Sequence, residues 1–277
     1  MIGRLLNLGA WACLALFWGG LGVPSVAGES DSVATATNAP LPQLTEPGED
    51  EFIFFVGDSI TQHGAREYGY VSQLRMAMEA NYPIRRIRVS ASGVGFNDSQ
   101  DVRRRLKQDV LRWNPTIVVV EIGLADLYYS EKRPIDKQMF LFAMKDIIWQ
   151  IRRANAQPVL MTLTIIGERF DGGNPLDAVI EEYCDAIRTL ARTKRCPVID
   201  VRPEFMTFLK RVNPDNRESG VLTPEDDGVH LNYYGNRLLA NLILEAFQVP
   251  LASDWRDKLA AEIESESGRP EQKVIRP

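Results

Sequence analysis

Apolar and polar positions along the chain follow two periods, one typical of strands and one typical of helices. Short apolar runs bounded by turn residues predict strands. They lie at 52–56, 86–90, 116–121, 158–162 and 198–200. Longer segments with an apolar residue every three or four positions predict helices. These lie at 70–80, 99–112, 135–154, 176–193, 203–212 and 234–247.

The order of these elements predicts the fold class. Helix-length segments separate the strands, and connections of this length are typical of parallel strands joined by right-handed crossovers. We therefore expect an α/β protein, built as a three-layer αβα sandwich around a five-stranded parallel sheet. In such sheets ligands bind beyond the carboxyl ends of the strands.

The two ends of the chain differ in composition from the region that carries these elements. Arg4, the apolar stretch after it and the small residues Ser25-Val26-Ala27 are typical of a secretory signal peptide. A membrane anchor is the alternative, but the stretch is short for a bilayer span and contains Asn7. We expect a secreted or periplasmic protein without stable membrane insertion after cleavage. The predicted organisation is a signal peptide over 1–27, a disordered linker over 28–50, one domain over 51–250 and a charged tail over 251–277, with a helix at 254–263.

Charge and motif content exclude several classes of function. The chain has 32 basic and 37 acidic residues, and its densest basic run, Arg103-Arg104-Arg105, is interpreted as the solvated face of a helix. No nucleic-acid partner is expected. No cofactor and no metal are expected. The two histidines belong to no zinc-binding motif, and the sequence has no phosphate-binding loop. The turn Gly93-Val94-Gly95 resembles a dinucleotide-binding loop, but Asp98 occupies the third glycine position. Cys184 and Cys196 are compatible with a disulfide or with two inert thiols.

Two distant segments carry the candidate chemistry. Gly57-Asp58-Ser59-Ile60 follows the first predicted strand, where a tight turn can hold a serine hydroxyl above the sheet. Asp227-Gly228-Val229-His230 places an acid three positions before a histidine, a spacing that allows the carboxylate to orient the imidazole as the base of that serine. By itself Gly-Asp-Ser is also typical of an ordinary turn. Together with the distant Asp and His it predicts a serine hydrolase.

These segments resemble the sequence blocks of the GDSL or SGNH hydrolase superfamily. The first block corresponds to residues 57–62, the glycine of the second to Gly93, and the last to residues 227–232 followed by Gly235. The resemblance spans 52–248 and implies a flavodoxin-like fold. It also implies a triad of Ser59, Asp227 and His230, with an oxyanion hole formed by the backbone N–H groups of Ser59 and Gly93.

The third block departs from the family pattern. The sequence Gly123-Leu124-Ala125-Asp126 has Ala125 where the family carries an asparagine that donates to the oxyanion. Removing one such donor typically costs about 2.7–4 kcal/mol of transition-state stabilisation. Asn97 is the expected substitute donor. Asn97, Ala125 and Asp126 are the predicted substrate-binding residues, and Asp126 is expected mainly to fix its turn. His63 is interpreted as a surface loop residue that is able to touch substrate from the mouth of the site.

The sequence leaves two classes of function open. The first is a secreted serine esterase that removes acyl groups, acetyl from carbohydrate being the type expected from the resemblance, with a small-molecule or carbohydrate ester as substrate. The second is a weak or inactive homologue that binds a glycan or an acylated ligand; an O-acyltransferase lies between the two. The loops at 164–175 and 213–223 are expected to form the walls of the substrate pocket.

Overall fold

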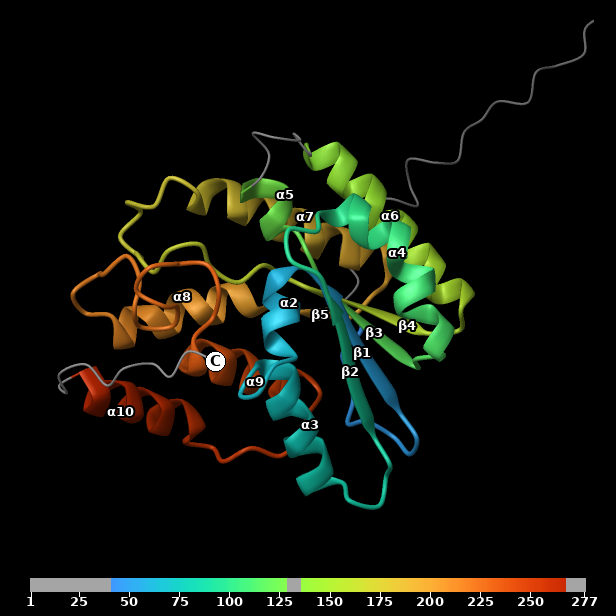
Figure 1. Ribbon diagram of the computed structural model, residues 1–277, viewed down its shortest axis with the longest axis horizontal. Coiled ribbons are helices and arrows are strands. Elements are labelled where there is room, and N and C mark those ends of the chain that lie inside the picture. The colour runs from blue at the N-terminus through green and yellow to red at the C-terminus, as the bar shows by residue number, and fades with distance from the viewer. Residues whose placement is uncertain (1–40, 129–135, 268–277) are drawn as a thin grey trace, which may run out of the picture.

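The structure is a computed structural model that describes residues 41–128 and 136–267 of the 277-residue chain. The predicted five-stranded parallel sheet is present, with its strands in the order β2-β1-β3-β4-β5 (Figure 1). The strands are β1 (Phe52–Gly57), β2 (Arg88–Gly93), β3 (Ile117–Glu121), β4 (Gln157–Met161) and β5 (Val198–Ile199). This strand order is that of the flavodoxin-like fold, so the predicted fold class is confirmed.

The strands at the centre of the sheet are buried on both faces, which explains their uninterrupted apolar sequences. Every residue of β1 and of β3 is buried, and the two strands pair in register from Ile53 with Ile117 to Gly57 with Glu121. Parallel sheets covered by helices on both sides need apolar residues on both faces. The edge strand β2 is only partly buried. Its small residues 90–92, two serines and an alanine, still pair with β1, so the strand runs over 88–93 rather than the predicted 86–90.

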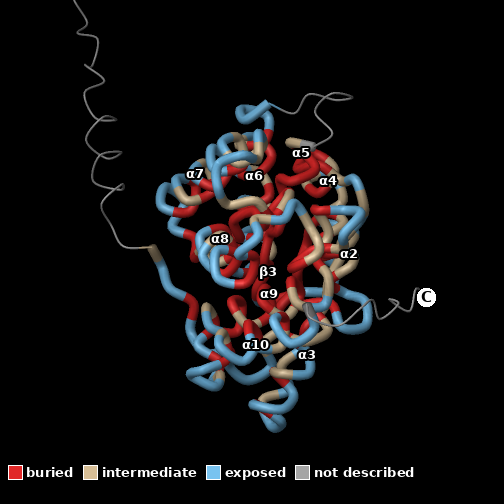
Figure 2. Tube along the Cα trace, turned by 90° about the vertical axis from the view of Figure 1, so that its left-hand side faces the viewer, coloured by how far each residue is buried: buried red, intermediate tan, exposed pale blue. Residues whose placement is uncertain are grey.

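Helices cover both faces of the sheet (Figures 1 and 2). One layer contains α4 (Ser99–Asp109), α6 (Lys137–Arg153) and α7 (Asp177–Lys194), and the other contains α3 (Tyr70–Asn81), α8 (Val201–Val212) and α9 (Tyr233–Ala246). Each of these helices buries the apolar stripe that predicted it; α6, for example, buries Phe140, Met144, Ile147 and Ile151. In Figure 2 the buried residues concentrate in the sheet and on the sides of the helices that face it.

Two short helices that the periodicity does not predict stand at the carboxyl ends of strands. Helix α2 (Ser59–Gly64) begins two residues after β1, and α5 (Leu124–Tyr128) begins soon after β3. The 3₁₀ turn η1 (Leu111–Trp113) replaces the end of the helix predicted over 99–112. Segments this short do not complete two turns of a periodic pattern, so periodicity cannot find them. Their position makes them the elements that shape the site.

The packed domain extends beyond both of its predicted boundaries. The linker prediction is wrong for residues 41–50, because Leu44 is only 6% exposed and its carbonyl oxygen accepts a hydrogen bond from Gln248 at 2.7 Å. At the other end α10 (Trp255–Ser267) packs on α8 and α9 and buries Trp255, Leu259 and Ile263, so it belongs to the domain rather than to a tail. The predicted signal peptide, linker residues 28–40 and residues 268–277 lie outside the described residues.

The structure also decides between the two states considered for the cysteines. Cys184 and Cys196 are both buried and unbonded, so they are free thiols rather than a disulfide. Burial raises the pKa of the Cys184 thiol to about 12, which makes it unreactive at neutral pH. Within residues 41–128 and 136–267, none of the helices has the length and the apolar composition needed to cross a bilayer.

Candidate active site

Ser59 is the first residue of α2, immediately beyond the end of β1. The side chain of Asp58 caps this helix, with Oδ1 accepting the N–H of Ile60 at 2.9 Å. Only glycine fits at position 57, since an added Cβ would lie 2.2 Å from the carbonyl oxygen of Glu121. The chain therefore turns sharply from strand to helix, and this turn places Ser59 at the carboxyl edge of the sheet.

Asp227 and His230 form a tight pair in the loop before α9. Asp227 Oδ2 lies 2.6 Å from His230 Nδ1, while Oδ1 accepts the N–H groups of Val229 at 2.9 Å and His230 at 3.0 Å. Burial alone would raise the pKa of Asp227, but the hydrogen bonds from His230 and Val229 outweigh it and hold that pKa below its ordinary value. An ionised carboxylate only accepts, so Nδ1 carries the proton and Nε2 is left as the basic nitrogen.

Ser59, Asp227 and His230 line one cavity of about 230 Å³, which we call the catalytic cavity. Its lining also includes the apolar residues Ile60, Leu124, Ala125 and Val229. His230 Nε2 is buried and has no hydrogen-bond partner among the described residues. The structure therefore brings the predicted triad to one place with the Asp227–His230 contact formed, while the contact between Ser59 Oγ and Nε2 is not closed. Catalytic hydrogen bonds often close only when substrate is bound.

Of the two predicted oxyanion donors, Ser59 lines the catalytic cavity, whereas Gly93 does not line it and lies against α2. Gly93 ends β2 and packs directly on α2, because an added Cβ would lie 2.0 Å from the backbone nitrogen of Gln62. Ala125, on α5, is 8% exposed and lines the catalytic cavity. Its methyl group stands at the place where the family pattern puts an amide, and it has no proton to donate.

Asn97 does not line the catalytic cavity, and its side chain is bound by Arg105. The Nε of Arg105 donates to Asn97 Oδ1 at 2.6 Å, and the same guanidinium donates to the carbonyl oxygen of Gly57 at 2.8 Å and to the hydroxyl of Ser92 at 2.6 Å. The interpretation of residues 103–105 as a solvated face is wrong for Arg105, whose side chain is only 15% exposed. The donor role of Asn97 stays a prediction.

Asp126 faces away from the catalytic cavity and is fully buried. Its Oδ1 accepts the hydroxyl of Ser99 at 2.6 Å and its Oδ2 accepts the N–H of Ser99 at 3.0 Å. Burial, offset in part by these hydrogen bonds, raises the pKa of Asp126 to about 7. The carboxyl fixes the start of α4 against α5, and the substrate contact of Asp126 stays a prediction.

His63 is a site residue that the sequence interpretation placed in a surface loop. It lies on α2, one helical turn after Ser59, and its ring packs against that of His230 with the ring centroids 4.5 Å apart and the planes 32° apart. Burial, and then the nearby His230, lower the pKa of His63, so His63 is neutral at pH 7. In the sequence, His63 follows Ser59 by four positions. This interval places the two residues on the same side of a helix, but only once α2 is known to be a helix.

The sequence matches the GDSL-like Lipase/Acylhydrolase family over residues 55–238, a range that runs from β1 into α9 and contains the whole catalytic cavity. The chain belongs to this family. It is therefore an ester hydrolase of the GDSL type.

Several relatives share both the family and the fold. An acetylxylan esterase from Geobacillus stearothermophilus is 25% identical over 215 residues, which are 71% of this chain and 94% of that protein. The crystal structure of the acetyl xylan esterase AlAXEase has a TM-score of 0.67 and 33% identity, covering 70% of this chain and 98% of that one. LAE5, an alpha/beta hydrolase enzyme from the metagenome of Lake Arreo, Spain, has a TM-score of 0.65 and 22% identity, covering 74% and 99%.

Solved structures of catalytic mutants provide a comparison of spacing. Axe2, an acetylxylan esterase from Geobacillus stearothermophilus, has crystal structures of three alanine variants described as catalytic mutants. They replace one serine, one aspartate and one histidine, and the aspartate precedes the histidine by three positions. Asp227 precedes His230 by the same interval.

A buried polar cluster supports α2 in this GDSL-family chain. Thr61 donates its hydroxyl proton to Glu121 Oε2 at 2.8 Å, so the hydroxyl of Tyr70, 2.9 Å away, donates to Thr61. Burial raises the pKa of Asp58 to about 6 and the pKa of Glu121 well above its ordinary value. Burial thus favours the protonated form of Glu121, and the chain of hydroxyls and carboxyls ties α2 to β3 beneath Ser59.

A second cavity, of about 410 Å³, adjoins the catalytic cavity and is called here the loop pocket. Its walls come from residues 166–175, from Glu218 and Ser219, and from residues 225–228. The loops at 164–175 and 213–223 therefore do form pocket walls beside the site, as the sequence predicts. Asp226 and Asp227 line both cavities.

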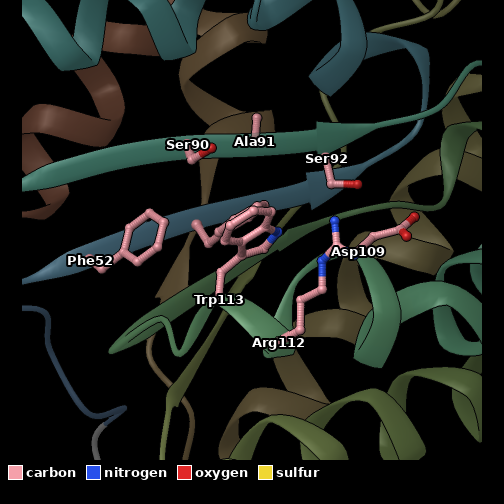
Figure 3. Close-up of a pocket in the computed structure, with 8 residues that line it drawn as sticks. Phe52, Ser90, Ala91, Ser92, Asp109, Arg112 and Trp113 are labelled. Carbon is pink, nitrogen blue, oxygen red and sulfur yellow. The ribbon is translucent and has the colours of Figure 1, made fainter.

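A third hollow, of about 450 Å³, lies between the edge strand β2 and η1 (Figure 3). Phe52, Ser90 and Ser92 line it from the strands, and Arg112 and Trp113 approach from η1. It has serine hydroxyls but no histidine among its lining residues, so it lacks the base that a serine nucleophile needs. Its larger volume therefore does not make it the site of GDSL chemistry.

Proposed function

We propose that this protein is a serine esterase that hydrolyses acyl esters through Ser59, His230 and Asp227 and an acyl-enzyme. The observation that carries the proposal is the 2.6 Å contact between Asp227 and His230 in the cavity that Ser59 also lines. The matching interval between the aspartate and histidine of the Axe2 catalytic mutants supports the same assignment.

The reaction proceeds in two acyl transfers. In the first, His230 Nε2 takes the proton of Ser59 as Oγ attacks the ester carbonyl carbon, and Asp227 stabilises the imidazolium that forms. Nε2 then gives this proton to the leaving alcohol as the carbon–oxygen bond breaks, which leaves the acyl group on Ser59. In the second transfer Nε2 takes a proton from water, the resulting oxygen attacks the acyl carbon, and Ser59 Oγ leaves with the proton from Nε2.

The negative charge on the former carbonyl oxygen requires donors in both transfers. We assign the backbone N–H groups of Ser59 and Gly93 to this role, since the side chain at position 125 has no donor. The catalytic cavity of about 230 Å³, with Leu124, Ala125 and Val229 in its walls, suits a small acyl group. Two relatives called acetylxylan esterases, 25% and 33% identical, favour acetyl esters of carbohydrate as the substrate class.

We propose in addition that the protein is exported after cleavage of residues 1–27, on the basis of the apolar stretch and the small residues Ser25-Val26-Ala27. Mass spectrometry of the protein isolated from an expressing bacterial cell tests this directly. A mature N-terminus at Gly28 supports export, whereas an intact N-terminus in the soluble cell fraction contradicts it.

Hydrolysis of p-nitrophenyl esters and of acetylated xylan tests the activity. The purified protein should hydrolyse p-nitrophenyl acetate and release acetate from the polysaccharide, with rates that fall steeply from acetate to butyrate to octanoate. Ser59→Ala should lose activity by roughly a thousandfold or more while keeping the melting temperature. A folded wild-type protein no faster than Ser59→Ala would contradict the esterase and favour a homologue that only binds its ligand.

A further inference from the structure

The loop pocket and the catalytic cavity meet at Asp226 and Asp227, which line both. An ester bound with its carbonyl carbon at Ser59 has two halves, and these leave the carbonyl in different directions. The catalytic cavity offers apolar walls and little volume. The loop pocket has nearly twice that volume and is lined mainly by glycines and polar or charged side chains, which suits a hydroxyl-rich alcohol half.

The loop pocket is held in shape by one buried carboxylate that the mechanism does not use. Glu168 is fully buried and accepts the N–H groups of Val221 at 2.9 Å, Leu222 at 2.7 Å and Thr223 at 2.6 Å, and the hydroxyl of Thr223 at 2.7 Å. Because Glu168 belongs to one loop and residues 221–223 to the other, a single side chain joins the two walls.

Further hydrogen bonds join the same two loops. The N–H of Phe170 donates to Asn216 Oδ1 at 2.9 Å, and Asn213 Nδ2 donates to the carbonyl oxygen of Glu168 at 3.1 Å. The walls of the loop pocket are therefore ordered before any ligand arrives. A preorganised wall loses less conformational entropy when a ligand binds, which is the property of a binding site rather than of an incidental gap.

The charge of the loop pocket is unbalanced. Arg169 is paired with Asp171 at 2.7 Å and lies 3.8 Å from Glu218, while Asp227 accepts a hydrogen bond from the neutral imidazole of His230 and keeps its negative charge. The carboxylates of Glu225 and Asp226 make no ion pair with any residue in the described part of the chain. Sugar hydroxyls can donate to these two groups, whereas a sugar carboxylate in the pocket would meet two like charges.

We propose that the loop pocket binds the alcohol half of the ester as an uncharged sugar, and that Glu225 and Asp226 discriminate against esters of acidic sugars. This inference rests on the proposed esterase function. Each carboxylate is expected to contribute a roughly threefold to tenfold preference at low ionic strength. The preference should shrink as salt is added, because exposed charges are screened.

Two matched acetyl esters test this discrimination. Methyl 3-O-acetyl-glucoside and methyl 3-O-acetyl-glucuronide differ only at C6, which is a hydroxymethyl group in one and a carboxylate in the other. At about 20 mM NaCl the wild type should have a kcat/KM at least about tenfold higher for the glucoside, and the ratio should fall in about 0.5 M NaCl. Combined Glu225→Gln and Asp226→Asn should lower the ratio at least several-fold, and the charge of Asp227 keeps a residual preference for the glucoside. Asp215→Asn, which removes an exposed carboxylate outside the loop pocket, should leave the ratio as in wild type.

A steric variant tests the location without relying on charge. Ser219→Phe places a ring in the loop pocket, so kcat/KM for the glucoside should fall at least about tenfold more than kcat/KM for p-nitrophenyl acetate. Equal losses on the two esters would overturn the location. A wild-type ratio near one, or a ratio that the double variant leaves unchanged, would overturn the discrimination while p-nitrophenyl acetate hydrolysis keeps the esterase function intact. A wild type that hydrolyses no ester overturns both.

Discussion

Arg105 donates a hydrogen bond to the carbonyl oxygen of Gly57 at 2.8 Å, and so connects the interior of α4 to the strand end that carries Ser59. The same guanidinium donates to the carbonyl oxygen of Ser92 at 3.0 Å, one residue before Gly93. One side chain thus fixes the spacing between the ends of β1 and β2, where the two proposed oxyanion N–H groups lie. Arg105 is a positioning residue, since it touches neither the catalytic cavity nor the triad.

Replacing Arg105 with lysine should lower both stability and turnover. Lysine cannot reproduce the fork of donors, so several buried acceptors lose their partners, and we expect unfolding to become easier by about 2–4 kcal/mol. Calorimetry and the kcat for p-nitrophenyl acetate measure the two effects. The neighbouring Arg104→Lys is the matched control, because that side chain is 56% exposed and Asp101 is its one ion-pair partner among the described residues. Equal melting temperatures for the two variants would contradict the role of Arg105.

Ala125→Asn should add the oxyanion donor that the family pattern contains and this chain lacks. Because position 125 lines the catalytic cavity, we expect kcat to rise, by at most about a hundredfold to a thousandfold. Ala125→Leu has the same number and branching of side-chain heavy atoms as the asparagine variant but has no donor, so it should not show the rise. If kcat stays constant in Ala125→Asn, another group already supplies the missing hydrogen bond, and Asn97→Ala then becomes the informative variant.

His63 should support catalysis through the contact of its ring with His230 rather than through a charge, because His63 is neutral at pH 7. Aromatic pairs are worth about 0.5–1.5 kcal/mol, so His63→Ala should reduce kcat/KM by roughly twofold to tenfold. His63→Phe keeps a ring at this position and should recover most of the loss. A phenylalanine variant as slow as the alanine variant would show that an imidazole nitrogen of His63, not its ring face, is required.

The long helices could be predicted because their apolar residues repeat over several helical turns. The central strands could be predicted because they are buried on both faces of the sheet and therefore have continuous apolar sequences. The runs at 52–56 and 116–121 read as strands, and β1 and β3 lie there. Residues 41–50 could not be assigned to the domain, because one buried leucine among prolines and acids has no periodicity. Helix α2 is six residues long and contains polar residues and glycine, so only the strand end beneath it and the cap by Asp58 reveal it.

The site was predictable as far as it depends on motif spacing. Ser59 follows a strand, and the interval between Asp227 and His230 is short enough to form a local pair, so the structure brings these three to one cavity. Residues that act through tertiary contacts carried no such signal. Arg105 belongs to a run of three arginines, a pattern typical of an exposed helix face. Glu168 is an acidic residue in a loop, and only the tertiary structure shows that it binds the opposing loop. Asp126 has the family spacing but faces the interior.

Stability should depend on pH through the buried carboxyl groups. The unfolded chain releases the protons of Asp58 and Asp126 near pH 3.8, whereas the folded protein holds them to about pH 6 and about pH 7, because burial raises both pKa values. The folded state binds more protons in this window, so the contribution of these groups to the unfolding free energy falls as pH rises from about 4 to about 7.

Asp126→Asn isolates one of these contributions. At about 1.4 kcal/mol per pKa unit, Asp126 accounts for a fall of up to about 4 kcal/mol, so the variant should show a flatter curve of unfolding free energy against pH. Urea unfolding at several pH values between about 4 and 8 measures the slope. Asp215→Asn, at an exposed position, should keep the wild-type slope. Parallel curves for Asp126→Asn and wild type would contradict the prediction.

The central claim is that the hydroxyl of residue 59 is a nucleophile activated by the imidazole of residue 230. Reaction of the folded protein with a fluorophosphonate, followed by intact-protein and peptide mass spectrometry, measures this property without any assumption about substrate. We expect one adduct per chain, located on Ser59, with no adduct in Ser59→Ala and labelling at least about a hundredfold slower in His230→Ala. Folded wild-type protein that remains unlabelled, or that carries the adduct on another residue, would contradict the account.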